Sequence, residues 1–365
     1  MPEDSSSLRL AGSYDELVSP LRFFHWITLF LAAGMGISLI LVFSFPKTAS
    51  VSSSEAMMDM GTTVKDDYAV IAGKALGPEL SEADFVILGS SSVRESLWED
   101  AKLGEECRSL GKTACHTIQL VASAQSLTEA LFLLDDAPLH SGQQVLLFVS
   151  PMTFAYDVKE TLFRMQEGFF LREPYPFAKK YRAKIPELKI ISRFPQPEIT
   201  FLRITRTVVY RHFFLGLKDW FSIHFYGQQP RMYERYQYSH VKLGRRVKTA
   251  LLMRKIRKRF RKGFPAHREY HERVLRVLIE RIREKGATPV LMETARLQEA
   301  SGIDPEEWEK YRSLLKKSTA EYGIAYVDLN SKVRFKPDDF VDGRHTTASG
   351  RNKWSPALAD WLSKQ

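Results

Sequence analysis

The stretch Phe85-Val86-Ile87-Leu88-Gly89-Ser90-Ser91-Ser92 (FVILGSSS, residues 85–92) begins the pattern that decides the fold. Its continuous apolar run is typical of a strand buried on both faces of a sheet. Similar short runs follow at 116–120, 145–149, 289–292 and 325–329. Helical patterns separate most of them, at 93–103, 125–135, 270–285, 305–322 and 349–363. This alternation predicts an α/β domain of three layers, with a five-stranded parallel sheet between helices.

The chain divides into regions of different composition. Residues 46–80 contain Ser, Met and Ala with scattered charges, and are expected to form a stalk with one short helix at 64–76. The main domain is expected at 81–365, with an insertion at about 152–265 between the third and fourth strands. Residues 151–240 hold 20 of the chain's 43 aromatic residues, a density that disordered segments do not show. Within them, a helix near 202–221 is expected to pack on the main domain or to lie in a membrane interface.

The charge of the chain is concentrated in one short band. Of 365 residues 44% are hydrophobic, which excludes a disordered or collagen-like chain, and the net charge is +10. The 21 residues from Lys242 to Lys262 include eleven basic and no acidic side chains, so the remainder carries −1. Such a band can attract an anionic polymer or lipid headgroups, or can be the solvated face of a helix. The residues assigned to that contact are Arg245, Arg246, Lys255, Arg257, Lys258 and Arg259.

An uncharged segment near the N-terminus predicts a membrane anchor. Residues 23–45 contain no Asp, Glu, Lys or Arg, and 23 residues can span a hydrocarbon core of about 30 Å. A cleaved signal peptide is the alternative, but its apolar core would be shorter. Flanking charges do not settle the orientation. We expect a short tail at 1–22 inside and a large domain outside, in a single-pass protein of the cell membrane.

Cys107 and Cys115 are the only cysteines, eight positions apart. In an oxidising compartment they could close a small loop, and otherwise they are two unrelated thiols. The sequence has no CxxC motif or His-rich cluster, so neither a metal nor another cofactor is expected.

Two short motifs lie at the two ends of the α/β pattern. The serines at 90–92 follow the first strand, and sites in parallel sheets lie beyond the carboxyl ends of strands. A serine nucleophile needs a histidine to accept its proton and a carboxylate to orient that histidine. Asp342-Gly343-Arg344-His345 precedes the last helix and offers both groups. The alternative is that the serines merely cap a helix.

With ILGSSS and DGRH at these places, the chain resembles the SGNH/GDSL hydrolase superfamily from about residue 84 to the end, apart from the insertion. The resemblance implies a nucleophile at Ser91 and a triad completed by Asp342 and His345. The family's oxyanion hole uses the serine amide, a glycine after the second strand and an asparagine after the third. This chain has neither that glycine nor that asparagine, so we assign the hole to Ser91, Ala122 and Ser123.

The anchor, the GSS turn and the Ser150-Pro151 after the third strand are more similar to a membrane-anchored branch of the superfamily. That branch includes the D-alanyl transfer protein DltD and the alginate O-acetylation proteins. The likeness implies an acyl-enzyme at Ser91, a cell-surface glycan or wall polymer as acceptor, and a membrane-bound O-acyltransferase as partner. Hydrolysis of glycan or lipid esters, and a non-catalytic polymer-binding or scaffold role, are the alternatives. Nucleic acid is not expected as a partner, because the domain is predicted to lie outside the cell.

Overall fold

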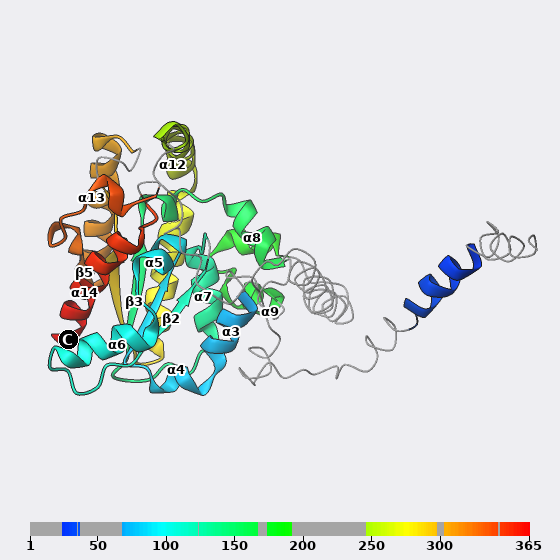
Figure 1. Cartoon of the computed structure of the whole chain (residues 1–365), viewed down its shortest axis with the longest axis horizontal. Coiled ribbons are helices and arrows are strands. Elements are labelled where there is room, and N and C mark those ends of the chain that lie inside the picture. The colour runs from blue at the N-terminus through cyan, green and yellow to red at the C-terminus, as the bar shows by residue number, and fades with distance from the viewer. Residues whose placement is uncertain are drawn as a thin grey trace, which may run out of the picture. The chain divides into compact units, whose positions relative to one another are not determined.

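The computed structural model describes residues 24–34, 36, 68–122, 124–166, 174–191, 246–297, 303–341 and 344–365. The chain forms two compact units, residues 1–50 and 51–365. The second unit holds the sheet and its helices (Figure 1).

The core of this unit is a parallel sheet of five strands in the order β2-β1-β3-β4-β5. The strands are β1 (Phe85–Gly89), β2 (Thr117–Val121), β3 (Gln144–Val149), β4 (Thr288–Glu293) and β5 (Ala325–Val327). Val86 lies beside Ile118 of β2 on one side and Val145 of β3 on the other. The prediction of a five-stranded parallel α/β sheet is confirmed, with strand ends within two residues of the apolar runs.

Helices cover both faces of the sheet. One face packs against α3 (Tyr68–Leu76), α7 (Leu127–Asp135), α12 (Arg246–Glu284) and α13 (Pro305–Tyr322). The other packs against α5 (Ser91–Ser96), α6 (Asp100–Ser109) and α14 (Ala348–Ser363). Short helices α4 (Pro78–Glu82), α8 (Val158–Gln166) and α9 (Pro174–Tyr181) and the 3₁₀ turns η1 (Pro151–Phe154), η2 (Pro186–Ile190), η6 (Leu329–Ser331) and η7 (Pro337–Asp339) complete the described elements.

Side chains alternate between the two cores along each strand, as the pleat requires. On β1, Val86 and Leu88 belong to the core under α7 and α12. Phe85 and Ile87 belong to the core under α6 and α14. Because both faces are covered, apolar residues are needed at every position, and all five residues of β1 are buried.

Two boundaries differ from the prediction. The helix predicted at 93–103 is two helices, α5 and α6, because the chain is extended at Leu97 and Glu99 between them. The predicted stalk does not reach residue 80, because Ile71, Ala72 and Leu80 are buried in the core of the domain. The domain therefore begins on the N-terminal side of residue 81.

The helix predicted at 270–285 is much longer in the structure. It is the C-terminal part of α12, which runs for 39 residues and continues through Pro265. Proline in a helix interior removes one hydrogen bond, and the rest of α12 tolerates this loss. Ile256, Phe260 and Phe264, spaced four residues apart, are all buried and fix the first half of the helix on the domain. The predicted end of the insertion, near residue 265, therefore lies in the middle of α12 and not at an element boundary.

Residues 24–34 form a helix whose described side chains are all exposed, with Phe24 at 68% and Phe30 at 76%. Most of the remaining predicted span, residues 37–45, lies outside the described residues, as does the predicted helix at 202–221. Among the residues that the structure describes, no helix has both the length and the apolar character to cross a membrane.

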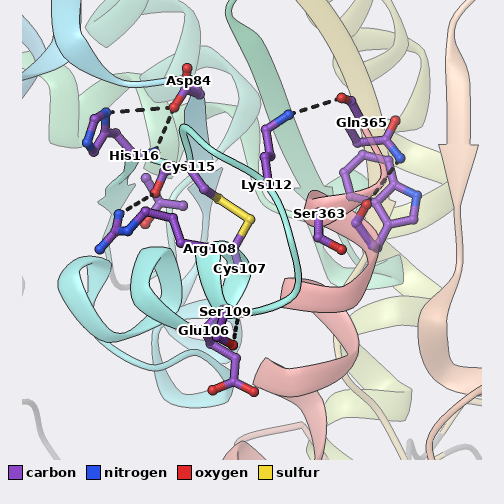
Figure 2. Close-up of a disulfide and its surroundings, with 12 residues drawn as sticks. Asp84, Glu106, Cys107, Arg108, Ser109, Lys112, Cys115, His116, Ser363 and Gln365 are labelled. Atoms are coloured by element: carbon purple, nitrogen blue, oxygen red, sulfur yellow. Dashed lines mark hydrogen bonds and ion pairs between the residues drawn. A yellow bond between two sulfur atoms is a disulfide. The ribbon is translucent and has the colours of Figure 1, made fainter.

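A disulfide joins Cys107, at the end of α6, to Cys115, just before β2 (Figure 2). Both residues are fully buried. Two contacts hold the closed loop in place: Arg108 donates to the carbonyl of Cys115, and Lys112 donates to the carbonyl of Gln365 at the end of α14. The cysteines therefore close a small loop through a disulfide and are not two unrelated thiols.

Removing this crosslink is expected to destabilise the domain. For a loop closed across eight positions, chain entropy gives a stabilisation of about 2.5 kcal/mol. The variant Cys107→Ala/Cys115→Ala should lose that amount in denaturant unfolding of the full-length protein in neutral detergent. Wild type unfolded in reductant is the matched control and should behave like the variant. Equal unfolding of oxidised and reduced wild type would contradict the crosslink.

Candidate active site

A pocket of about 320 Å³ lies beyond the carboxyl ends of β1, β3 and β4. In the strand order, β1 is flanked by β2 and β3, so connections leave β1 in opposite directions on its two sides. Parallel α/β sheets bind ligands at such a switch point. The pocket's lining includes Ser91 after β1, Ser150 after β3, Arg296 after β4 and His345 before α14.

Ser91 is presented by a tight passage from strand to helix. Gly89 ends β1, Ser90 is extended, and Ser91 is the first residue of α5. A Cβ on Gly89 would lie 2.5 Å from a methyl carbon of Val93, so only glycine allows the helix to start this close to the strand. All three serines line the pocket. The hydroxyls of Ser90 and Ser92 lie 2.9 Å from each other, and of the three hydroxyls in this turn only that of Ser91 forms a hydrogen bond with a described residue from another part of the chain.

His345 is held by the loop that leads into α14. The amide of Val341 donates to the carbonyl of His345, and Phe340 forms an antiparallel bridge with Thr346. Thr346 is fully buried, and its hydroxyl donates to the carbonyl of Glu95 in α5 at 2.6 Å. The residue next to His345 is thus bonded directly to the helix that begins with Ser91.

The Ser91 hydroxyl oxygen lies 2.9 Å from Nε2 of His345, across 254 positions of sequence. This is the distance at which an imidazole can accept the hydroxyl proton. The two motifs at the ends of the α/β pattern are therefore brought together in one pocket. Asp342, the third predicted member, lies outside the described residues, so its role stays a prediction.

The segment after β2 differs from the assignment of the oxyanion hole. Ala122 is fully buried, and its amide donates to the carbonyl of Gly89 at 3.2 Å. The prediction for Ala122 is wrong, because its amide already donates a hydrogen bond to the last residue of β1 and is not free to bind an oxyanion. Ser123 lies outside the described residues. It is Ala124 that lines the pocket, with a φ of 53°, a backbone conformation that costs a non-glycine residue about 1 kcal/mol or more.

A buried glutamine that the sequence reasoning missed ties this segment to β1. The Gln125 side chain accepts from the amide of Gly89 at 2.9 Å and donates to the carbonyl of Leu120 at 3.0 Å. It therefore holds the strand end before Ser91 against the end of β2. No motif identified it, because a lone glutamine at a helix start has no distinctive spacing.

A buried ionic cluster forms the pocket wall beyond β4. Arg296 donates to Glu293 at 2.7 Å and to Asp328 at 2.8 Å, and lies over the ring of Trp308. Burial raises the pKa of Glu293 to about 7, and Arg296 opposes that rise. The same guanidinium lowers the pKa of Asp328 against the effect of its burial. Arg296 forms part of the pocket wall, and the two carboxylates that it binds compensate its charge.

His271 of α12 supports another part of the wall. Its ring is fully buried and its Nε2 lies 3.0 Å from the carbonyl of Tyr156, a pocket residue. A nitrogen that bonds to a carbonyl must donate, and Nδ1 is buried without a partner. Burial lowers the pKa of His271 to about 4, with a smaller contribution from the charge of His267. The folded protein therefore keeps this imidazole neutral.

Acidification should weaken the fold through His271. Its pKa is lower in the folded state than the usual 6.5, so its contribution to stability is present above pH 6.5 and is lost as pH falls toward 4. The shift corresponds to about 3 kcal/mol. His271→Gln keeps an N–H donor for Tyr156 without the titration. Between pH 7.5 and 4, the unfolding free energy of wild type should therefore fall by about 3 kcal/mol more than that of the variant. If the two proteins lose the same unfolding free energy over this range, His271 does not titrate as described.

The six basic residues predicted to contact an anionic polymer or lipid do not all lie in the same surroundings in the structure. Lys255 and Arg259 line the pocket, and Arg257 pairs with Asp304 at 3.5 Å. Lys258 is exposed and is not part of the pocket lining. Arg246 is the first residue of α12, and Arg245 lies outside the described residues.

Within the described residues, no group of three or more His, Cys, Asp or Glu side chains is arranged to hold a metal ion. No family model matches the sequence. A search of curated proteins also finds no match. Among solved structures, the chain is similar to an extracellular lipase from Streptomyces rimosus, with 14% identity and a TM-score of 0.31 over 76% of this chain and 98% of the lipase. A TM-score this low does not establish a shared fold.

Proposed function

We propose that this chain is a serine esterase or acyltransferase of the SGNH type, with Ser91 as nucleophile, His345 as base and Asp342 as the carboxylate that orients the histidine. The observation that carries the proposal is the 2.9 Å contact between the Ser91 hydroxyl and His345 Nε2 in the lining of the pocket. A serine that only capped α5 would not need a histidine from the other end of the domain.

Acylation follows from this geometry. The Ser91 oxygen attacks the carbonyl carbon of an ester, and its proton passes to His345 Nε2. The resulting oxyanion needs donors, and the amide of Ser91 is suited because the first amides of a helix have no intrahelical acceptor. Collapse of the intermediate expels the alcohol, which takes the proton from His345. The product is an ester on Ser91.

The second half of the reaction decides between transfer and hydrolysis. An acceptor hydroxyl, or water, gives its proton to His345 and attacks the acyl carbon. The bond between the acyl carbon and the Ser91 oxygen then breaks, and His345 returns the proton to that oxygen. Transfer requires that water be kept from the acyl-enzyme. Apolar side chains of Ile256, Ile303 and Trp308 line the pocket and support this requirement. We therefore favour transfer, with hydrolysis as the second outcome.

We further propose that the domain is extracytoplasmic and anchored through residues 23–45. The disulfide supports an oxidising compartment, because cytosolic proteins rarely keep one. The helix at 24–34 supports the anchor, because its large apolar side chains are exposed. The acceptor is then a cell-surface glycan or wall polymer, and a membrane-bound O-acyltransferase would supply the acyl group.

A fluorophosphonate probe tests the nucleophile, because it reacts only with an activated serine. Full-length protein in neutral detergent should be labelled on Ser91, and Ser91→Ala should not be labelled. His345→Ala should slow labelling on the order of 100-fold or more, as loss of a general base does. Ser90→Ala is the matched control in the same turn and should retain labelling. Equal labelling of wild type and Ser91→Ala would rule out this nucleophile.

Transfer is separated from hydrolysis by product analysis. Wild type supplied with a vinyl ester and an excess of glycerol should form acylglycerol as well as free acid. Ser91→Ala should form neither. Free acid without acylglycerol would assign the protein to hydrolysis.

A further inference from the structure

The charge of the pocket is one-sided. Its lining includes Lys255, Arg259, Arg296 and Arg344 beside His345, and none of the described lining residues is Asp or Glu. An esterase pocket for neutral substrates has no need of this arrangement. Arg296 is paired with two carboxylates, Glu293 and Asp328, which compensate its charge. Among the residues that the structure describes, the two cations from α12, Lys255 and Arg259, have no such pair of buried carboxylates.

Lys255 and Arg259 lie one helical turn apart, so they share one face of α12. Both are exposed. Among the described residues, no carboxylate pairs with Lys255. Arg259 pairs with Glu160 at 3.1 Å, and its guanidinium lies over the ring of Tyr156. Both members of that ion pair are half exposed, so an anionic ligand can displace Glu160 from Arg259, or share Arg259 with it, at small cost.

Other described residues of the basic band lie outside the pocket lining. Arg257 and Arg261 pair with Asp304, at 3.5 and 2.5 Å. Lys258 is exposed outside the pocket lining. One run of sequence therefore supplies a pair of cations to the pocket and a different pair to a salt bridge on the surface.

The position of the two pocket cations is fixed by packing. Ile256 and Phe260 are buried on the adjacent face of α12. A Cβ on Gly263 would lie 2.2 Å from the carbonyl oxygen of Ala155, so glycine lets the helix touch the segment after β3. The helix is thereby held directly against one side of the pocket. Lys255 and Arg259 are built into the rim rather than borne on a freely moving loop.

We propose that Lys255 and Arg259 make the Ser91 pocket selective for esters that carry an anionic group on the same molecule. The inference rests on the proposed function, and it names the substrate class of that site. A guanidinium binds a carboxylate, sulfate or phosphate through two parallel N–H donors, and an ammonium adds a point charge. The anion is a carboxylate, sulfate or phosphate borne by a glycan or by a lipid headgroup.

A pair of esters that differ in charge tests the selectivity. 4-Acetoxybenzoate and its methyl ester present the same acetyl group to Ser91. In full-length protein at low salt, Lys255→Gln/Arg259→Gln should lower kcat/KM for the anionic ester about tenfold relative to the neutral one. Added salt should reduce the difference. Lys258→Gln removes a charge from the same helix outside the pocket, and should leave the ratio unchanged.

Two results would overturn the inference. One is an unchanged ratio of kcat/KM for the anionic ester to kcat/KM for the neutral ester in the double variant. The other is an equal fall of this ratio in Lys258→Gln, which would show that the overall positive charge of the helix matters and not these two residues. Competition identifies the source of the anion. A uronic-acid oligosaccharide that inhibits wild type but not the double variant indicates a glycan, and micelles containing phosphatidylglycerol that do so indicate a headgroup. Inhibition that is equal in both proteins counts against the two residues.

Binding to Ser91→Ala protein separates this inference from the proposed function. 4-Acetamidobenzoate is an uncleaved analogue, and ligand-observed NMR should detect its binding to Ser91→Ala. The signal should be lost when Lys255→Gln/Arg259→Gln is added and kept when Lys258→Gln is added. If neither ester is cleaved by wild type while this pattern holds, the proposed function fails and the anion site stands. If both esters are cleaved without charge preference and no binding is seen, the anion site fails and the function stands.

Discussion

The contact between α5 and the segment leading into α14 sets the distance on which the site depends. The carbonyl of Glu95 accepts from the Thr346 hydroxyl at 2.6 Å and from Nε of Arg351 at 2.9 Å. The Glu95 carboxylate is fully buried and pairs with Arg94 and Arg351. Because these bonds fix the loop next to His345 on the helix that begins with Ser91, the two reactive groups meet at 2.9 Å.

The buried charges around Glu95 also explain why this arrangement is specific. A buried carboxylate is costly unless it is paired, and Glu95 is paired with Arg94 of its own helix and with Arg351 of α14. Burial lowers the pKa of Arg351, and the nearby Glu95 opposes that shift. The next turn of α14 adds Ser355, whose hydroxyl donates to the carbonyl of Ser96 and accepts from the amide of Trp98. Hydrogen bonds and ion pairs therefore join α5 to α14, and a shift of α14 along its axis would break them.

The second organising element is α12, which serves both the core and the pocket. Its C-terminal half buries Val274, Leu278 and Ile282 against the sheet, and its N-terminal half carries Lys255 and Arg259 to the rim. The proposed chemistry and the proposed selectivity therefore come from different parts of the chain. The serine and histidine come from the α/β frame, whereas the charge comes from the insertion.

The sheet could be predicted from the amino-acid sequence, because strands buried on both faces must be apolar at every position and so stand out as short runs. Ser91 and His345 could also be identified, since both lie in short motifs at strand and helix ends. Which basic residues face the pocket depends on the packing of Ile256, Phe260 and Gly263, because this packing sets the rotation of α12. Only the tertiary structure shows that the Ala122 amide is bonded to Gly89 and that Gln125 and Glu95 hold the site. Those contacts join residues far apart in sequence, and neither composition nor spacing records them.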